Sequence, residues 1–291
     1  MGSIAGMTPK SILVATDLTS RCDRALDRAV QLAAAWRAKL VALHVLEERE
    51  AESSLPSWRR VSDPQEAARA RVRRDLRLDQ ASDLEVDVVV ERGNPAERIV
   101  EVVERNGCGL VLTGVGRDEL LGRESLGATV NTLLRAAGVP ILVVKSRPHG
   151  PYRDAVVATD FSEASRRALE TALALWPDLG ITLLHGFGVI YEGFLDDKMS
   201  AREDAARKAQ EECRAFLAAT PAASGRSIAT LCEYGDPATL LFDLAQARDI
   251  DLVVLGTEGR RGVAQLFLGS VAERVATQVP VDVLLVRRPR A

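Results

Sequence analysis

The sequence predicts an α/β protein built from two tandem copies of one domain, each with a five-stranded parallel open sheet. Two observations predict this fold class. Sequence motifs recur about 142 residues apart, and within each copy short apolar runs alternate with amphipathic helical patterns. Continuous apolar runs are typical of strands buried on both faces, and strands that alternate with helices form parallel sheets. The length of 291 residues also fits two domains of roughly 150 residues each.

The repeat is visible in matched motifs. SILVATDLTSRCDRAL (11–26) resembles DAVVATDFSEASRRAL (154–169), so Asp17 corresponds to Asp160. Gly93 corresponds to Gly235, and Gly127 to Gly269, both at a separation of 142 residues. A period this long indicates domain duplication, since solenoid repeats are far shorter. The segment SRPHGPYR (146–153) is predicted to be a linker because its prolines and glycine disfavour helix and strand. We therefore expect domains at 1–147 and 148–291.

The predicted elements of the first copy follow from hydrophobic period, and the second copy repeats their order. Apolar residues at helical spacing, from Ala25 to Trp36, predict the first helix. Pro95 is expected in the first turn of a later helix. In chain order, the other elements are a strand at Ile12–Thr16, a strand at Leu40–Leu46, a helix at Ala67–Leu78, a strand at Leu84–Val90, a helix at Asn94–Glu104, a strand at Leu110–Gly114, a helix at Thr129–Ala137 and a strand at Ile141–Val144.

Composition excludes several classes of protein. A hydrophobic fraction of 47% argues against disorder, and a net charge of -3 argues against a nucleic-acid partner. Four scattered cysteines form no CxxC motif, and no apolar run is long enough to cross a membrane. The N-terminus lacks the apolar stretch of a signal peptide. We expect a cytoplasmic protein with no membrane partner.

The segment with the clearest chemistry lies in the second copy. Gly256 and Gly259 follow the predicted fourth strand (Leu252–Leu255), and Gly269-Ser270 precedes the last predicted helix (Val271–Thr277). Backbone amides of such glycines can form a nest for phosphate oxygens, and a helix N-terminus favours an anion. Ligands of open α/β sheets bind at this carboxyl edge. The pattern predicts a phosphate-binding loop.

This G-x2-G-x9-G-[S/T] pattern resembles the ATP-binding loop of the universal stress protein family. Further similar motifs are ATDF (158–161), LLH (183–185), the GDP turn (235–237) and GSVAERV (269–275). The resemblance implies a Rossmann-like, adenine nucleotide alpha hydrolase-like fold that binds ATP, with Mg²⁺ held through the phosphates. It places the adenine and ribose near Ala158, Asp160 and Gly186. It places the ribose and phosphates along Leu255, Gly256, Glu258, Gly259, Gly269, Ser270 and Val271.

Each of these residues also has a purely structural interpretation. Asp160 and Ser270 could cap helices, and Gly256 could serve a tight turn between strand and helix. Glu258 would repel phosphate unless a cation offsets its charge. His44 and His185, at equivalent strand positions, are expected to be packed core histidines.

The first copy departs from the pattern. The position that matches Gly259 is Arg117, and the position that matches Ser270 is Ala128. Asp17 and Gly114 are retained. One hydroxyl donor is therefore missing and the nest is altered, so we expect weak ATP binding in this copy, or none.

The expected function is ATP binding as a regulatory ligand in the stress response. Two alternatives stay open: a non-nucleotide interaction or chaperone-like module, and an enzyme such as a slow ATPase. The SGGxDS loop of related ATP pyrophosphatases is absent, since the corresponding stretches read TDLTS and TDFSE. We also expect a protein partner of unknown identity. The apolar last strands, Ile141–Val144 and Val283–Val286, predict an intramolecular pseudo-dimer through their open edges, with a further homodimer conceivable.

Overall fold

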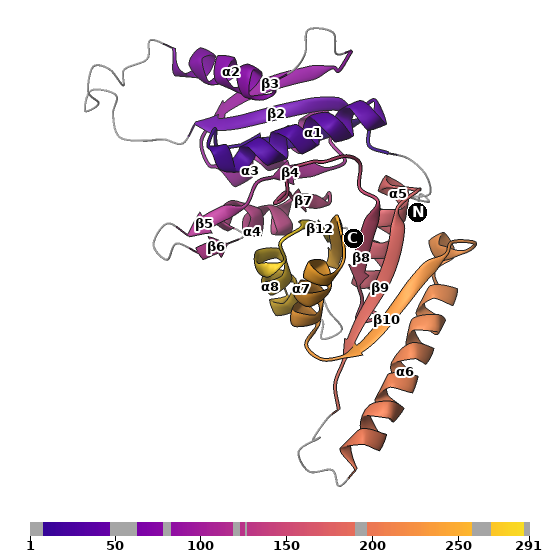
Figure 1. The fold of residues 1–291 in the computed structure, drawn as a ribbon. Helices are drawn as coiled ribbons and strands as arrows, with labels where there is room; N and C mark the ends of the chain where they lie inside the picture. Colours follow the sequence, from indigo (N-terminus) through magenta and orange to yellow (C-terminus); the bar gives the residue numbers. More distant parts are fainter. Residues whose placement is uncertain are drawn as a thin grey trace. The chain divides into compact units, whose positions relative to one another are not determined.

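The first half of the chain folds around a parallel sheet. In the computed structural model, which describes residues 8–46, 63–77, 83–118, 123–125, 127–189, 197–257 and 269–287, contacts divide the chain into a unit spanning 9–151 and a second unit that begins at Tyr152 (Figure 1). The described strands of the first sheet pair in the order β3-β2-β1-β4-β7. They are β1 (Ser11–Thr16), β2 (Lys39–Leu46), β3 (Val86–Arg92), β4 (Val111–Thr113) and β7 (Ile141–Val143). The helices are α1 (Asp23–Trp36), α2 (Pro64–Asp75), α3 (Pro95–Asn106) and α4 (Gly127–Ala136).

The second unit repeats this topology. Its described strands also pair in parallel, in the order β10-β9-β8-β11-β12. They are β8 (Asp154–Ala158), β9 (Gly180–Phe187), β10 (Ile228–Tyr234), β11 (Leu252–Gly256) and β12 (Asp282–Val286). The helices are α5 (Glu163–Leu175), α6 (Lys198–Ala218), α7 (Pro237–Ala247) and α8 (Ser270–Gln278). The predicted fold class, two copies of a five-stranded parallel sheet with alternating helices, is confirmed for the described residues.

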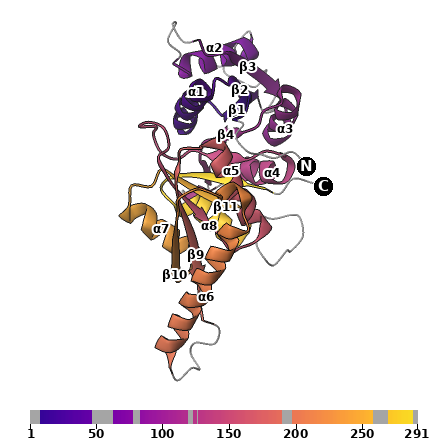
Figure 2. The ribbon, with the colours of Figure 1, turned by 90° about the vertical axis from the view of Figure 1, so that its right-hand side faces the viewer.

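Helices cover both faces of the second sheet (Figure 2). A Cβ at Gly186 would meet Pro237 and Leu240 of α7, whereas the ring of the adjacent His185 contacts Phe161, which in turn contacts Phe216 of α6. Successive side chains of a strand point to opposite faces, so α6 and α7 lie on opposite sides of β9. The core between these layers is aliphatic, with Leu183, Val254 and Leu284 fully buried.

Local capping explains where several helices begin. Asp63 accepts hydrogen bonds from the amides of Gln65 and Glu66, and Pro64 occupies the first turn of α2. The helix predicted at Ala67–Leu78 therefore starts three residues earlier than expected. Asn94 and Asp236 cap α3 and α7 in the same way, each before a proline.

The structure adds an element that the sequence did not predict. Gly116–Asp118 (β5) pairs antiparallel with Arg123–Ser125 (β6) in the first unit, after β4. Arg117, the counterpart of Gly259, lies in this hairpin. These strands read GRD and RES and contain no apolar residue, so they lack the hydrophobic pattern by which the other strands were predicted.

None of the helices in the described part of the chain is long and apolar enough to span a membrane.

Candidate functional site

The carboxyl edge of the second sheet has a topological switch point. The chain continues from β8 to β9 on one side, whereas β11 pairs with β8 on the other. Ligands of open α/β sheets bind in the crevice outside such a reversal. Ala158, Asp160, Gly186, Leu255 and Gly256 all lie at or just beyond the ends of these three strands, so the fold brings the predicted residues to one edge.

A tight turn positions Asp160 directly after β8. The Thr159 hydroxyl accepts a hydrogen bond from the amide of Phe161 at 2.9 Å, and an Asp160 carboxylate oxygen accepts one from the amide of Ser162 at 3.0 Å. Phe161 has a φ of 63°, in the left-handed region that non-glycine residues rarely occupy. Ser162 is the N-cap of α5, with its hydroxyl accepting from the Ser165 amide at 3.3 Å. Asp160 therefore supports the turn and is not the helix cap.

The first unit builds the same turn, and its aspartate accepts several hydrogen bonds. Leu18 has a φ of 60°, and its amide donates to the Thr16 hydroxyl at 3.0 Å. Asp17 accepts hydrogen bonds from the Thr19 amide and hydroxyl at 2.8 and 2.7 Å and from the Cys22 thiol at 3.1 Å. Burial raises the pKa of Asp17, but these hydrogen bonds outweigh burial, so the net pKa lies below its usual value. The Asp17 carboxylate thus already accepts hydrogen bonds from neighbouring residues of its own turn.

The backbone of Gly186 faces the space beyond β8. The Leu184 carbonyl accepts a hydrogen bond from the Thr159 amide at 2.9 Å, which shows that Leu184 directs its backbone groups toward β8. Alternate residues of a strand direct these groups to the same side. Gly186 thus presents its amide and carbonyl past Ala158, where β8 ends. The first unit has Val45 at this position, since His44 and His185 occupy equivalent register positions.

Gly256 has a packing role of its own. A Cβ at this position would lie 2.7 Å from the carbonyl carbon and oxygen of Ala164, in the first turn of α5. Gly114 is equally constrained in the first unit, because its Cβ would lie 2.8 Å from the Arg21 carbonyl oxygen. Close approach of strand and helix therefore accounts for this glycine in both units. Leu255, next to it, is buried.

The N-terminus of α8 is exposed and has no side-chain cap. Gly269 is the N-cap residue, and it, Ser270 and Val271 are exposed. The Gly269 amide donates to the Thr257 carbonyl at 3.2 Å, which ties this helix terminus to the end of β11. Ser270 is the first residue of the helix and not its cap. The first amides of a helix have no intrahelical acceptor, so this turn can receive an anion. Glu258 and Gly259 lie outside the described residues.

A cation on α8 was missed by the sequence reasoning. Arg274 forms two hydrogen bonds with the Asp236 carboxylate, at 3.0 and 2.9 Å. These bonds hold the pKa of Asp236 below its usual value. The pair joins α8 to the N-terminus of α7, next to the Gly235 turn that packs on Gly186. Arg274 belongs to the GSVAERV motif and Asp236 to the GDP motif. Because they are 38 positions apart, their pairing could not be recognised from the sequence.

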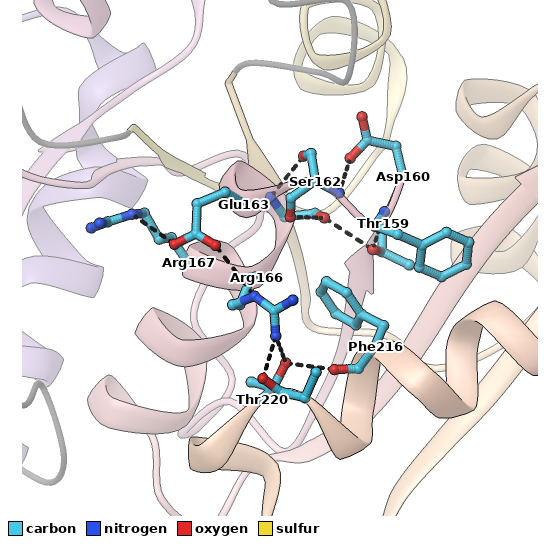
Figure 3. A network of polar contacts seen from close by, with 11 residues as sticks. Thr159, Asp160, Ser162, Glu163, Arg166, Arg167, Phe216 and Thr220 are labelled. Carbon is cyan, nitrogen blue, oxygen red and sulfur yellow. Dashed lines mark hydrogen bonds and ion pairs between the residues drawn. The ribbon is translucent and has the colours of Figure 1, made fainter.

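A polar network joins the start of α5, which follows the Asp160 turn, to the C-terminal end of α6 (Figure 3). Arg166 of α5 donates to the Ala219 carbonyl at 2.6 Å and to the Thr220 hydroxyl at 2.8 Å, and its guanidinium lies 5.0 Å from the Phe216 ring centroid. Glu163 pairs with Arg166 and Arg167 at 3.3 and 3.6 Å. The C-terminal end of α6 is therefore held against the start of α5, beside Asp160.

The two histidines at the strand ends are structural. His44 Nδ1 lies 2.8 Å from the Thr16 carbonyl oxygen, and His185 Nδ1 lies 2.8 Å from the Thr159 carbonyl oxygen. The His185 ring also stacks against Phe161, with centroids 4.3 Å apart. In the described segments no three metal-binding side chains gather at one point.

Comparison with known proteins agrees with this architecture. The model of the universal stress protein family matches twice, over residues 8–145 and 151–287. A universal stress protein from Mycolicibacterium smegmatis is 24% identical, covering 98% of this chain and 99% of its own. One from Thermus aquaticus is 32% identical over 47% of this chain and 99% of its own.

Solved structures show the same fold. A protein of unknown function from Pseudomonas aeruginosa has a TM-score of 0.65 at 22% identity, covering 97% of this chain and 93% of its own. A universal stress protein from Archaeoglobus fulgidus has a TM-score of 0.62 at 17% identity, covering 96% of this chain and 98% of its own. Together with the duplicated sheet and the repeated strand-end turn, these matches identify the chain as a tandem, two-domain member of the universal stress protein family.

Proposed function

We propose that the second domain binds ATP as a regulatory ligand in a cytoplasmic stress response, and that the first domain binds it weakly or not at all. The observation that carries the proposal is the exposed, uncapped first turn of α8 beside the switch point between β8 and β11. The amides of this turn would bind phosphate oxygens. Four free thiols fit a reducing compartment.

The remaining predicted residues fit the rest of the nucleotide. Ala158 and the backbone of Gly186 would line the adenine, with Asp160 toward the nucleoside. The half-exposed Ala158 and Asp160 leave room for such a contact. Gly256 would bring the β11 backbone close to the phosphates, with Glu258 and Gly259 following. Mg²⁺ would be held through the phosphates and water.

Regulation is favoured over rapid turnover. Fast hydrolysis requires a base that orients water, and His185 Nδ1 is already bonded to the Thr159 carbonyl. Glu258 is the one carboxylate beside the glycines in the sequence. Bound ATP would instead favour one arrangement of the loop and α8, and a partner protein would bind that arrangement. Release of ADP at several turnovers per second, lost in Glu258→Gln, would mean that the protein is an ATPase.

The binding test uses a charge at the start of α8. Val271 is 36% exposed, so aspartate fits there, and an acidic residue in a first helical turn stabilises the helix. Val271→Asp should nevertheless weaken ATP binding at least tenfold, or ~1.4 kcal/mol, because the carboxylate repels the phosphates. Calorimetric titration with Mg-ATP of the full-length protein measures this. Loss of binding could not then be attributed to loss of the helix.

The first domain supplies the matched control. Thr129 corresponds to Val271, because each lies two residues after the equivalent glycines Gly127 and Gly269. Thr129→Asp should leave ATP affinity unchanged. Equal loss in both variants would contradict the assignment to the second domain. A wild-type protein that binds no ATP would favour the non-nucleotide interaction or chaperone-like role.

A further inference from the structure

Two cysteines of the second domain lie side by side. The sulfur atoms of Cys213 on α6 and Cys232 on β10 are 3.2 Å apart. A disulfide requires about 2.05 Å, so the two sulfurs need to approach by only about 1 Å. The other two cysteines contact oxygen atoms: Cys22 bonds to Asp17, and Cys108 lies 3.4 Å from the Ser11 hydroxyl.

We propose that Cys213 and Cys232 are a peroxide-sensitive pair that forms a reversible disulfide between α6 and β10. Cys213 is 1% exposed, whereas Cys232 is partly accessible. The oxidant can therefore reach the Cys232 sulfur, and the Cys213 sulfur lies next to it. This arrangement of an accessible thiol with a resolving thiol is typical of redox-sensing sites.

The order of attack follows from accessibility, since peroxide reaches Cys232 before the buried Cys213. Burial, the largest cause, also raises the pKa of the Cys213 thiol, which favours its protonated form. The Cys232 thiolate attacks hydrogen peroxide: an S–O bond forms, the O–O bond breaks, and hydroxide leaves and is protonated to water. Cys213 then loses its proton and attacks the Cys232 sulfur. The S–S bond forms, the S–O bond breaks, and the hydroxide leaves as a second water with that proton. The two thiols supply the two electrons that reduce the peroxide.

The duplicated first domain shows that packing alone does not require thiols here. Cys232 is in register with His185, and Val90 is in register with His44. Ala68 and Val72 are the buried residues of α2, spaced as Ala209 and Cys213 are on α6. Val90 thus holds the register position of Cys232, and Val72 has the same spacing from a buried alanine on α2 as Cys213 has on α6. The same architecture is built there with inert aliphatic side chains.

The pair is connected to the turn that holds Asp160. Phe216 lies three residues after Cys213, on the same side of α6. Its ring centroid is 5.8 Å from that of Phe161, which directly follows Asp160. A disulfide would hold α6 against β10 and restrain Phe161. A consequent change in ATP affinity rests on the proposed function, whereas the restraint on Phe161 can be measured without nucleotide.

Peptide mapping of the full-length protein tests the disulfide. The protein is treated with hydrogen peroxide, alkylated under denaturing conditions and digested with trypsin. Cys213 falls in peptide 209–214 and Cys232 in peptide 227–248. We expect these peptides linked, with the mass of two hydrogens lost, and separated again by dithiothreitol. Cys22 and Cys108, in peptides 22–24 and 106–117, should remain alkylated. Alkylation of both Cys213 and Cys232 after peroxide would overturn the proposal.

Cys232→Val, which copies Val90, is the control variant. It should form no linked peptide, and its buried Cys213 should stay alkylatable; oxidation of Cys213 at the wild-type rate would overturn the order of attack. Hydrogen exchange then measures the connection to Asp160. Oxidation should slow exchange of the Phe161 and Ser162 amides several-fold in the wild type and leave it unchanged in Cys232→Val. Unchanged exchange in the linked wild type would overturn that connection, whatever the ATP affinity.

Discussion

At the scale of single residues, Asp236 combines a helix cap with an ion pair. Its carboxylate accepts from the Thr239 amide at the start of α7 and also binds the Arg274 guanidinium. Asn94 caps α3 in the same way in the first domain, where Thr132 replaces the arginine. The duplication therefore contains both versions of one cap, and the contribution of the charge can be separated from that of the cap.

Substitutions of Asp236 should separate these contributions. Asp236→Ala removes the cap and should lower the free energy of unfolding by about 1–2 kcal/mol. Asp236→Asn keeps an acceptor, as Asn94 does, and loses only a half-exposed ion pair, so its cost should stay below about 1 kcal/mol. Urea denaturation measures both. An equal loss in the two variants would show that the ion pair, and not the cap, is the larger contribution.

The pH dependence of stability should also report on Asp236. Hydrogen bonds from Arg274 lower its pKa in the folded state below the usual 3.8. A group whose pKa is lower in the folded state contributes stability above its unfolded pKa and loses it as pH falls through the folded value. The stability difference between wild type and Asp236→Asn should therefore be constant near neutral pH and shrink below pH 3.8. A difference that grows on acidification would contradict this assignment.

At the scale of elements, the approach of β11 to α5 depends on Gly256. Its missing Cβ lets the strand lie against backbone atoms of Ala164, which cannot move as a flexible side chain can. Gly114 and Arg21 repeat the contact between β4 and the segment before α1.

Gly256→Ala should destabilise the second domain by about 1–3 kcal/mol, because overpacking displaces the helix or strand. Gly114→Ala should do the same in the first domain. Gly138→Ala is the control, since a Cβ there meets no atom within 4 Å. Thermal unfolding of the three variants checks the expectation. A stable Gly256→Ala protein that has lost ATP binding would instead assign this glycine to the ligand.

At the scale of the whole molecule, the two domains share one scaffold but differ in residues at the carboxyl edge of the sheet. Both domains have the strand-end turn with a left-handed residue, at Leu18 and Phe161, and the same strand order. They differ at a position where a ligand would bind, because the first domain has Val45 at the register position of Gly186. The pseudo-dimer through the two last strands stays a prediction.

ATP should therefore protect only one of the two domains. At a free concentration of 100 times its Kd, a ligand stabilises its domain by about 2.7 kcal/mol. Hydrogen exchange should slow in β8, β11 and α8 and stay unchanged in β1, β4 and α4. Equal protection of both halves would indicate that the first domain also binds ATP, despite its altered loop.

The location in the fold of much of the candidate site was predictable because its signals are local. Ala158, Asp160, Gly186 and Ser270 lie where the motifs placed them, at strand ends and a helix start. Arg274 and Phe216 were not predicted, because each acts through a residue on another element, Asp236 or Phe161. The helix caps at Ser162 and Gly269 also differed from the candidates, since capping depends on where each helix begins in space.

By itself the sequence determined the duplication, the alternation of the main strands and helices in each copy, and the position of the candidate residues at the carboxyl edge of the second sheet. Hydrophobic period, capping residues and glycine spacing are properties of short segments, so they can be recognised without coordinates. Only the tertiary structure decided that Cys213 meets Cys232, that Ala164 fills the space beside Gly256, and that Arg274 reaches Asp236. Those contacts depend on how helices pack across a sheet, which brings together residues that are distant in the chain.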